Sequence, residues 1–147
     1  MFLVLSLLLF FLSLFFTAVV TTLLPLSTMY TGSCLCGAVR YEIHGDIDRT
    51  SLCWCTMCQK QHGAACGPYA NVASAALRIV AGADAITRYA SSPGVERAFC
   101  GVCGANLTWQ MAEHSDRIAV TLGTFDTPYE GRVTHELHTD SKPGWLP

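Results

Sequence analysis

The hydrophobic residues of this 147-residue chain follow two different patterns, and the change falls near Met29. From Phe2 to Leu26 apolar residues form an almost unbroken run, which contains ten Leu and five Phe. After Met29 the apolar residues come in short stretches separated by glycine, serine and proline. Short apolar stretches between turn residues are typical of β-strands. The pattern therefore predicts a hydrophobic leader, residues 1–28, followed by a mainly β domain, residues 29–147.

Several segments after Met29 have the composition of strands. Val39, Tyr41 and Ile43 alternate with polar residues, which predicts a strand with one buried face. Further strand-like segments cover residues 77–80, 86–90, 95–100, 106–111, 118–122 and 133–138. One helical element is expected, a turn or two over residues 56–62 that ends at Gly63. Strands that recur at such short intervals favour an all-β domain.

The leader has three possible interpretations. As a helix, residues 2–26 would be roughly 37 Å long, which is enough to cross the hydrocarbon core of a bilayer. The run can therefore be a membrane anchor, or it can be an upstream extension of a protein that starts at Met29. A signal peptide fits less well, because the run carries no Lys or Arg and is too long. If the leader is inserted, Arg40 is the nearest positive charge and places the domain in the cytoplasm.

The distribution of charged residues excludes one class of function, nucleic-acid binding. The 9 basic and 11 acidic residues all lie between Arg40 and Lys142, and the net charge is −2. A chain with this balance and no basic run is not expected to bind nucleic acid. The length is that of one domain.

Seven of the eight cysteines fall into three tight clusters. The clusters are Cys34 with Cys36, then Cys53, Cys55 and Cys58, and finally Cys100 with Cys103. Disulfide frameworks usually scatter their cysteines so that each bridge closes a long loop. Cysteines two or three positions apart instead present several thiolates to one metal ion, and Zn²⁺ takes four ligands. A thiolate–zinc domain also favours a reducing compartment, which agrees with a cytoplasmic location.

The spacing divides these seven cysteines into a group of four and a group of three. The two outer pairs make a closed four-thiolate site, whose role is structural because no position stays open. The central Cys-x-Cys-x₂-Cys run makes a three-thiolate site with a fourth position for water or a substrate thiol. Two nearby residues are alternative fourth ligands: His62, one helical turn after Cys58, and Cys66.

Residues 32–41, Gly-Ser-Cys-Leu-Cys-Gly-Ala-Val-Arg-Tyr, resemble the opening of the glutathione-dependent formaldehyde-activating enzyme family, whose domain is shared with centromere protein V. The central cysteine run, followed by Lys60, occurs in the order of that family. So does the later Cys-x₂-Cys-Gly-x-x-Leu over residues 100–107. His135 and Trp145 resemble its C-terminal end, so the resemblance covers about residues 30–146.

This resemblance implies a mainly β, Mss4-like fold with short helical turns and two zinc ions. Its pattern gives the structural zinc to Cys34, Cys36, Cys100 and Cys103. The catalytic zinc goes to Cys53, Cys55 and Cys58. The implied activity is that of a zinc-dependent carbon–sulfur lyase of the S-(hydroxymethyl)glutathione synthase type, acting on formaldehyde and glutathione. A non-catalytic Mss4-like zinc module that binds a protein or a small ligand is the alternative.

The chemistry of this reaction selects a few more residues. Three thiolates leave a zinc site at a formal charge of −1, so we expect it to activate a substrate thiol rather than polarise a carbonyl. Lys60, Arg97 and Arg40 are candidate partners for the two carboxylates of glutathione. His135 is a candidate for proton transfer to the carbinol oxygen.

Overall fold

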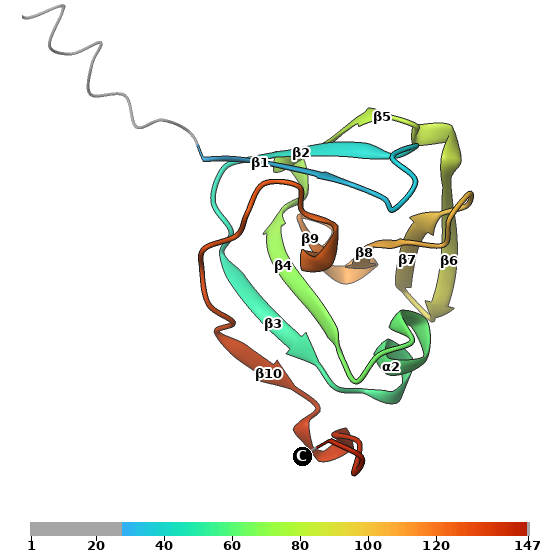
Figure 1. The fold of residues 1–147 in the computed structure, drawn as a ribbon, viewed down its shortest axis with the longest axis vertical. Helices are drawn as coiled ribbons and strands as arrows, with labels where there is room; N and C mark the ends of the chain where they lie inside the picture. Colours follow the sequence, from blue (N-terminus) through green and yellow to red (C-terminus); the bar gives the residue numbers. More distant parts are fainter. Residues whose placement is uncertain (1–27, 147) are drawn as a thin grey trace, which may run out of the picture.

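The computed structural model describes residues 28–146, and the leader interpreted above lies outside that range except for Thr28. The described residues form two β-sheets and a short α-helix, α2 (Thr56–His62) (Figure 1). The smaller sheet has the strand order β1-β2-β5, and the larger sheet has the order β10-β3-β4-β9-β8-β7-β6. All paired strands are antiparallel except β10 and β3, which run parallel. The mainly β prediction is confirmed.

The strand bounds give the positions used below. The smaller sheet consists of β1 (Met29–Ser33), β2 (Arg40–His44) and β5 (Leu77–Ala81). The larger sheet consists of β3 (Arg49–Cys53), β4 (Gly67–Ala73), β6 (Ile86–Ser92), β7 (Val95–Cys100), β8 (Asn106–Met111), β9 (Arg117–Thr121) and β10 (His135–Leu137).

The main core lies between the two sheets. Tyr41 and Ile43 of β2 point into it, as their alternation with polar residues predicts, and are joined there by Val72 of β4 and Val120 of β9. All four side chains are at most 2% exposed. The Tyr41 hydroxyl keeps a polar partner in this apolar setting, since it lies 2.8 Å from Oγ1 of Thr124.

The chain passes from the smaller sheet to the larger one at Gly82. This residue has φ of +69°, and a Cβ placed there would lie 2.0 Å from the carbonyl oxygen of Ala38. Only glycine fits such a left-handed position so close to another backbone. The strands predicted over residues 77–80 and 86–90 are present as β5 and β6. Because the chain changes sheet at Gly82, they do not pair with each other: β5 pairs with β2, and β6 pairs with β7.

The face of the larger sheet that is turned away from the main core carries a continuous row of cross-strand neighbours. One row of cross-strand neighbours runs over it from β6 to β3, in the order Tyr89, Arg97, Trp109, Ala119, Asn71 and Arg49. We call these six residues the cross-strand row. A register shift between β7 and β8 at Phe99 lets Leu107 pack into the main core although Trp109 belongs to the row.

The helix α2 follows β3 and lies near the lower ends of β4 and β7 (Figure 1). Its bounds agree with the sequence prediction, and Gly63 ends it in the left-handed conformation with φ of +58°. Among residues 28–146 no helix is long and apolar enough to span a membrane.

Candidate metal centres

Four cysteines from distant parts of the chain meet at one point. The Sγ atoms of Cys34, Cys36, Cys100 and Cys103 all lie within 4.8 Å of one another. The Cys34–Cys36 and Cys36–Cys100 sulfur distances are 3.5 and 3.9 Å. Tetrahedral zinc with Zn–S bonds of about 2.3 Å requires sulfur–sulfur distances of about 3.8 Å, so the donor set fits this ion. We call this group the four-cysteine cluster.

Two tight turns build the four-cysteine cluster. The amide of Gly37 donates to the carbonyl of Cys34 at 2.9 Å, and the amide of Gly104 donates to that of Cys100 at 2.8 Å. Each glycine has a positive φ, +73° and +77°, which turns the chain so that backbone amides face sulfur. Hydrogen bonding by the backbone of Ala105 is the largest cause that lowers the pKa of Cys103, to about 6. The turn thus favours the thiolate, which is the form that binds metal.

Cys53, Cys55 and Cys58 form the second group, the three-cysteine cluster, in which all sulfur atoms lie within 4.8 Å of one another. It occupies the junction between β3 and α2. Cys53 ends the strand, Cys55 caps the helix, and its sulfur accepts the amide hydrogen of Cys58 at 3.4 Å. The Cys53–Cys55 sulfur distance of 3.5 Å again fits two ligands of one zinc ion.

Three protein donors make up this cluster in the described part of the chain. Neither His62 nor Cys66, the alternative fourth ligands, belongs to it. The Nε2 atom of His62 instead lies 2.9 Å from the hydroxyl of Tyr69. A tetrahedral ion held by three donors keeps one position for water or substrate, which is the feature that separates catalytic from structural zinc.

A buried arginine lies against the three-cysteine cluster. Arg97 is 4% exposed, and its Nη1 and Nη2 atoms lie 3.7 and 3.8 Å from the sulfur of Cys58. Its Nε donates to Oγ of Ser91 at 3.0 Å, and Nη1 also donates to the side chain of Gln61. The pKa of Cys58 is lowered to about 5, first by hydrogen bonding with Cys53 and then by Arg97, against the opposing effect of burial.

Tyr69 of β4 completes the surroundings of Cys58. Its hydroxyl lies 3.8 Å from the Cys58 sulfur and is the same group that meets His62. Gly67 leaves room for this arrangement, because a Cβ there would lie 2.8 Å from the Tyr69 ring and 3.0 Å from Nε2 of His62. Sequence reasoning missed Tyr69, since its approach to Cys58 depends on the pairing of β3 with β4.

The C-terminal segment packs over the same junction. The amide of Trp54 donates to the carbonyl of Leu137 at 2.9 Å, and the side chain of Gln59 donates to that of Ser141 at 2.8 Å. The ammonium of Lys142 lies 4.6 Å from the centre of the Trp54 ring. These contacts hold residues 137–142 beside the cysteines, and a cation over an aromatic face is stabilising.

Comparison with known proteins agrees with this geometry. The family model described as glutathione-dependent formaldehyde-activating enzyme matches residues 29–141. The chain belongs to that family. A crystal structure of a Rhodobacter sphaeroides protein has a similar fold, with a TM-score of 0.59 and 24% sequence identity over 70% of this chain and 96% of that one.

In this member of the glutathione-dependent formaldehyde-activating enzyme family, the remaining predicted residues lie in different places. Lys60 and Arg97 line one pocket of about 480 Å³ beside α2, which we call the Lys60 pocket. Arg40 lies on the smaller sheet, and its Nε donates to the carbonyl of Gly37 at 3.4 Å. His135 is exposed on β10, where Nδ1 lies 2.9 Å from Oγ1 of Thr134.

Proposed function

We propose that this protein is a zinc-dependent carbon–sulfur lyase of the S-(hydroxymethyl)glutathione synthase type, with one zinc ion in each cysteine cluster. The observation that carries the proposal is the three-cysteine cluster, which offers three thiolates to a metal ion and has a buried cation against one of them. Membership of the glutathione-dependent formaldehyde-activating enzyme family supports the substrate pair. The working domain in this proposal is residues 29–147, in a reducing compartment such as the cytoplasm.

The reaction joins a thiol to an aldehyde without any redox change. A carbon–sulfur bond forms, the carbonyl π bond breaks, and the thiol proton ends on the new hydroxyl oxygen. The reverse reaction breaks the carbon–sulfur bond and returns the proton to sulfur. Zinc in the three-cysteine cluster would supply the positive charge that keeps the substrate thiol in its reactive thiolate form at neutral pH.

The side chains around the cluster have separate tasks in this proposal. Arg97 balances the negative charge of the cysteines, because its guanidinium faces Cys58 rather than solvent. Lys60 is exposed on α2 and lines the same pocket, so it is the group that receives a glutathione carboxylate. Tyr69 and His62 orient Cys58 through one hydrogen-bonded chain. His135 remains our candidate for proton transfer to the hydroxyl oxygen.

Zinc content and exchange kinetics test the proposal together. The full chain is expected to contain two zinc ions and to accelerate the exchange between free formaldehyde, glutathione and their adduct, as followed by NMR exchange spectroscopy. Cys55→Ser should abolish the acceleration and lower the zinc content to one ion. Cys66→Ser is the matched control, because Cys66 belongs to neither cluster, and it should change neither quantity.

Each other outcome has a clear meaning. Two zinc ions without any acceleration over the spontaneous reaction would overturn the lyase proposal and support a non-catalytic zinc module. Acceleration that survives Cys55→Ser would remove the three-cysteine cluster from the reaction. A single zinc ion in the unmodified protein would overturn the two-metal assignment.

A further inference from the structure

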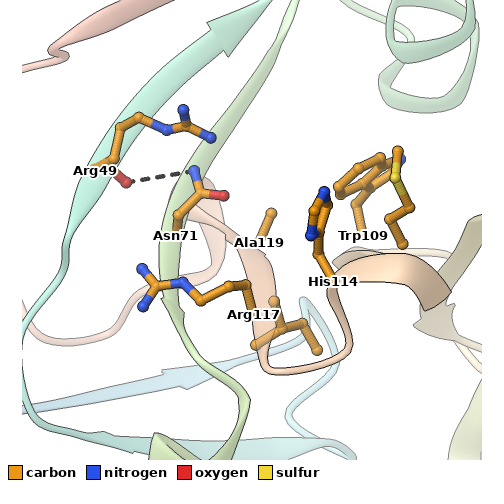
Figure 2. A pocket seen from close by; sticks show the side chains of 8 residues that line it. Arg49, Asn71, Trp109, His114, Arg117 and Ala119 are labelled. Carbon is orange, nitrogen blue, oxygen red and sulfur yellow. Dashed lines mark hydrogen bonds between the residues drawn. The ribbon is translucent and has the colours of Figure 1, made fainter.

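A second pocket opens on the same face of the larger sheet. It has a volume of about 460 Å³ and is lined mainly by Arg49, Asn71, Trp109, His114 and Arg117 (Figure 2). Figure 2 shows Arg49, Asn71 and Arg117 on one side of this space, and His114 with Trp109 on the other. We call it the Arg49 pocket. None of the residues predicted from the sequence as substrate contacts lines it.

The cross-strand row connects the two pockets. Tyr89 and Arg97 line the Lys60 pocket at one end of the row, and Asn71 and Arg49 line the Arg49 pocket at the other. The three-cysteine cluster lies against the part of the row formed by Arg97, Trp109 and Ala119. Cys58 contacts Arg97 there, and Trp109 packs against the apolar group that contains Cys53, Cys58 and Ala119. The three-cysteine cluster therefore lies between two pockets that both contain cationic side chains.

The Arg49 pocket has an excess of positive charge. Its lining contains two arginines and a histidine, and no carboxylate. Arg117 forms an ion pair with Asp48, which takes up one of the two guanidinium charges. Among residues 28–146 no carboxylate forms an ion pair with Arg49, so its charge is available to a ligand. Arginine is the side chain best suited to bidentate binding of a carboxylate.

The remaining lining suits the carbon skeleton of a small ligand. Trp109 presents an aromatic ring that lines the pocket and also packs against the buried group of Cys53, Cys58, Tyr69 and Ala119. Met111 and Ile118 add apolar surface, and the amide of Asn71 adds a polar group beside Arg49. A few polar groups in an otherwise apolar cavity are typical of small-molecule sites.

We propose that the Arg49 pocket binds a carboxylate of an anionic thiol substrate whose sulfur lies at the three-cysteine cluster. This inference rests on the proposed function, and it assigns the two ends of the substrate to two different pockets. With Lys60 on one side and Arg49 on the other, the protein selects a thiol that carries a carboxylate at each end. Thiols that lack the second carboxylate gain nothing from the Arg49 pocket.

Binding of S-methylglutathione to the zinc-loaded full chain tests this inference. The methylated sulfur has no proton to lose and no aldehyde is present, so the measurement reports recognition of the carboxylates and not the reaction. The Kd is measured by calorimetry, and the indole N–H resonance of Trp109, assigned with Trp109→Phe, shows where the ligand lies. S-methylglutathione diethyl ester, which has no free carboxylate, is the ligand control.

Arg49→Gln is the informative variant, because Arg49 has no ion pair within residues 28–146 to disturb, whereas Arg117→Gln would leave Asp48 without its partner. Arg78→Gln is the matched control: it removes the same charge from an exposed arginine on the smaller sheet. Arg49→Gln should raise the Kd of S-methylglutathione about tenfold or more, since a hydrogen bond between charged groups is lost. It should leave the zinc content at the value of the unmodified protein.

Every result bears on the inference. It holds if Arg49→Gln weakens binding, Arg78→Gln does not, and the diester binds both proteins equally weakly. An unchanged Kd in Arg49→Gln, equal weakening by both variants, or no binding to the unmodified protein would overturn it. Because the lyase reaction is absent, an Arg49-dependent Kd together with no acceleration of hemithioacetal exchange would overturn the proposed function alone.

Discussion

The guanidinium of Arg97 directs both of its terminal nitrogens at the sulfur of Cys58, although the two residues are 39 positions apart in the chain. Both nitrogen–sulfur distances are below 4 Å, at 3.7 and 3.8 Å, and the arginine is 4% exposed. A cation buried this deeply would be costly without a negative partner. The position of Arg97 therefore indicates that Cys58 is a thiolate in the working protein.

We predict that Arg97→Gln weakens metal binding at the three-cysteine cluster alone. Loss of a partner to a metal ligand usually lowers affinity about 10- to 100-fold. Titration with a coloured chelator should release one zinc ion earlier than from the unmodified protein, and the second zinc ion should be unaffected. Arg88→Gln, on the neighbouring strand and 60% exposed at its side chain, should behave like the unmodified protein. Equal release in both variants would contradict this role of Arg97.

Loss of a cysteine should unfold the protein in the four-cysteine cluster but not in the three-cysteine cluster. Structural zinc contributes about 10–16 kcal/mol on binding, which is as large as the total stability of a typical domain. Cys100→Ser should therefore leave the protein largely unfolded by circular dichroism. Cys55→Ser should keep its β-sheet spectrum and lose only one zinc ion. A folded Cys100→Ser protein would show that the four-cysteine cluster does not hold the sheets together.

A substitution at Gly82 tests whether the chain passes close to the backbone of Ala38 where it leaves the smaller sheet. Gly82→Ala would place a methyl group 2.0 Å from the carbonyl oxygen of Ala38, in addition to the cost of a left-handed alanine. Gly94→Ala is the matched control, since Gly94 has a similar φ of +71° and, apart from its chain neighbours, no atom of residues 28–146 lies within 4 Å of the added Cβ. Both variants should lose about 1–2 kcal/mol from the backbone conformation, and Gly82→Ala about 2 kcal/mol more from the clash. Urea unfolding of the zinc-loaded proteins measures the difference, and equal losses would refute the close approach.

The stability of the protein should also depend on pH through His62. Burial is the largest cause that lowers the pKa of this histidine below its ordinary value of 6.5. As the pH falls below 6.5, His62 of the unfolded chain binds a proton before His62 of the folded chain does. The contribution of neutral His62 to the free energy of unfolding is therefore full above pH 6.5. It is lost as the pH falls through the pKa of the folded state. The difference in Tm between the unmodified protein and His62→Gln, with excess zinc, should shrink between about pH 7.5 and 5.5. A constant difference would contradict the depressed pKa.

Much of the fold could be predicted where one face of a strand is buried. Tyr41 and Ile43 show the alternation of β2, and the glycine predicted to end the helix, Gly63, does end α2. The bounds of β7 and β8 also agree with the sequence, because a tight cysteine turn separates them. Strand β3 was missed, since its neighbouring residues Thr50 and Ser51 are both buried and give no alternation.

The candidate site likewise contains residues that a local sequence pattern predicts and residues that only the fold brings together. Cysteine spacing is local information, so it separates the three-cysteine cluster from the outer pairs without any knowledge of the fold. Tyr69 and Arg49 carry no local pattern. Arg49 shares a face with Cys53 because both lie on β3, four positions apart, and the pairing of β3 with β4 adds Tyr69 to that face. The role of Arg97 was likewise hidden, because a charged residue within a strand is usually exposed.

The two clusters differ in how far apart their ligands lie in the chain. The three-cysteine cluster is contained within residues 53–58, whereas Cys36 and Cys100 are 64 positions apart. During synthesis on the ribosome, a nascent chain that has exposed residue 58 already carries a complete three-thiolate set. The four-thiolate set becomes complete only after Cys103 has emerged. The direction of translation therefore allows the three-cysteine cluster, which is the reactive centre in the proposed function, to bind metal before the four-cysteine cluster is complete.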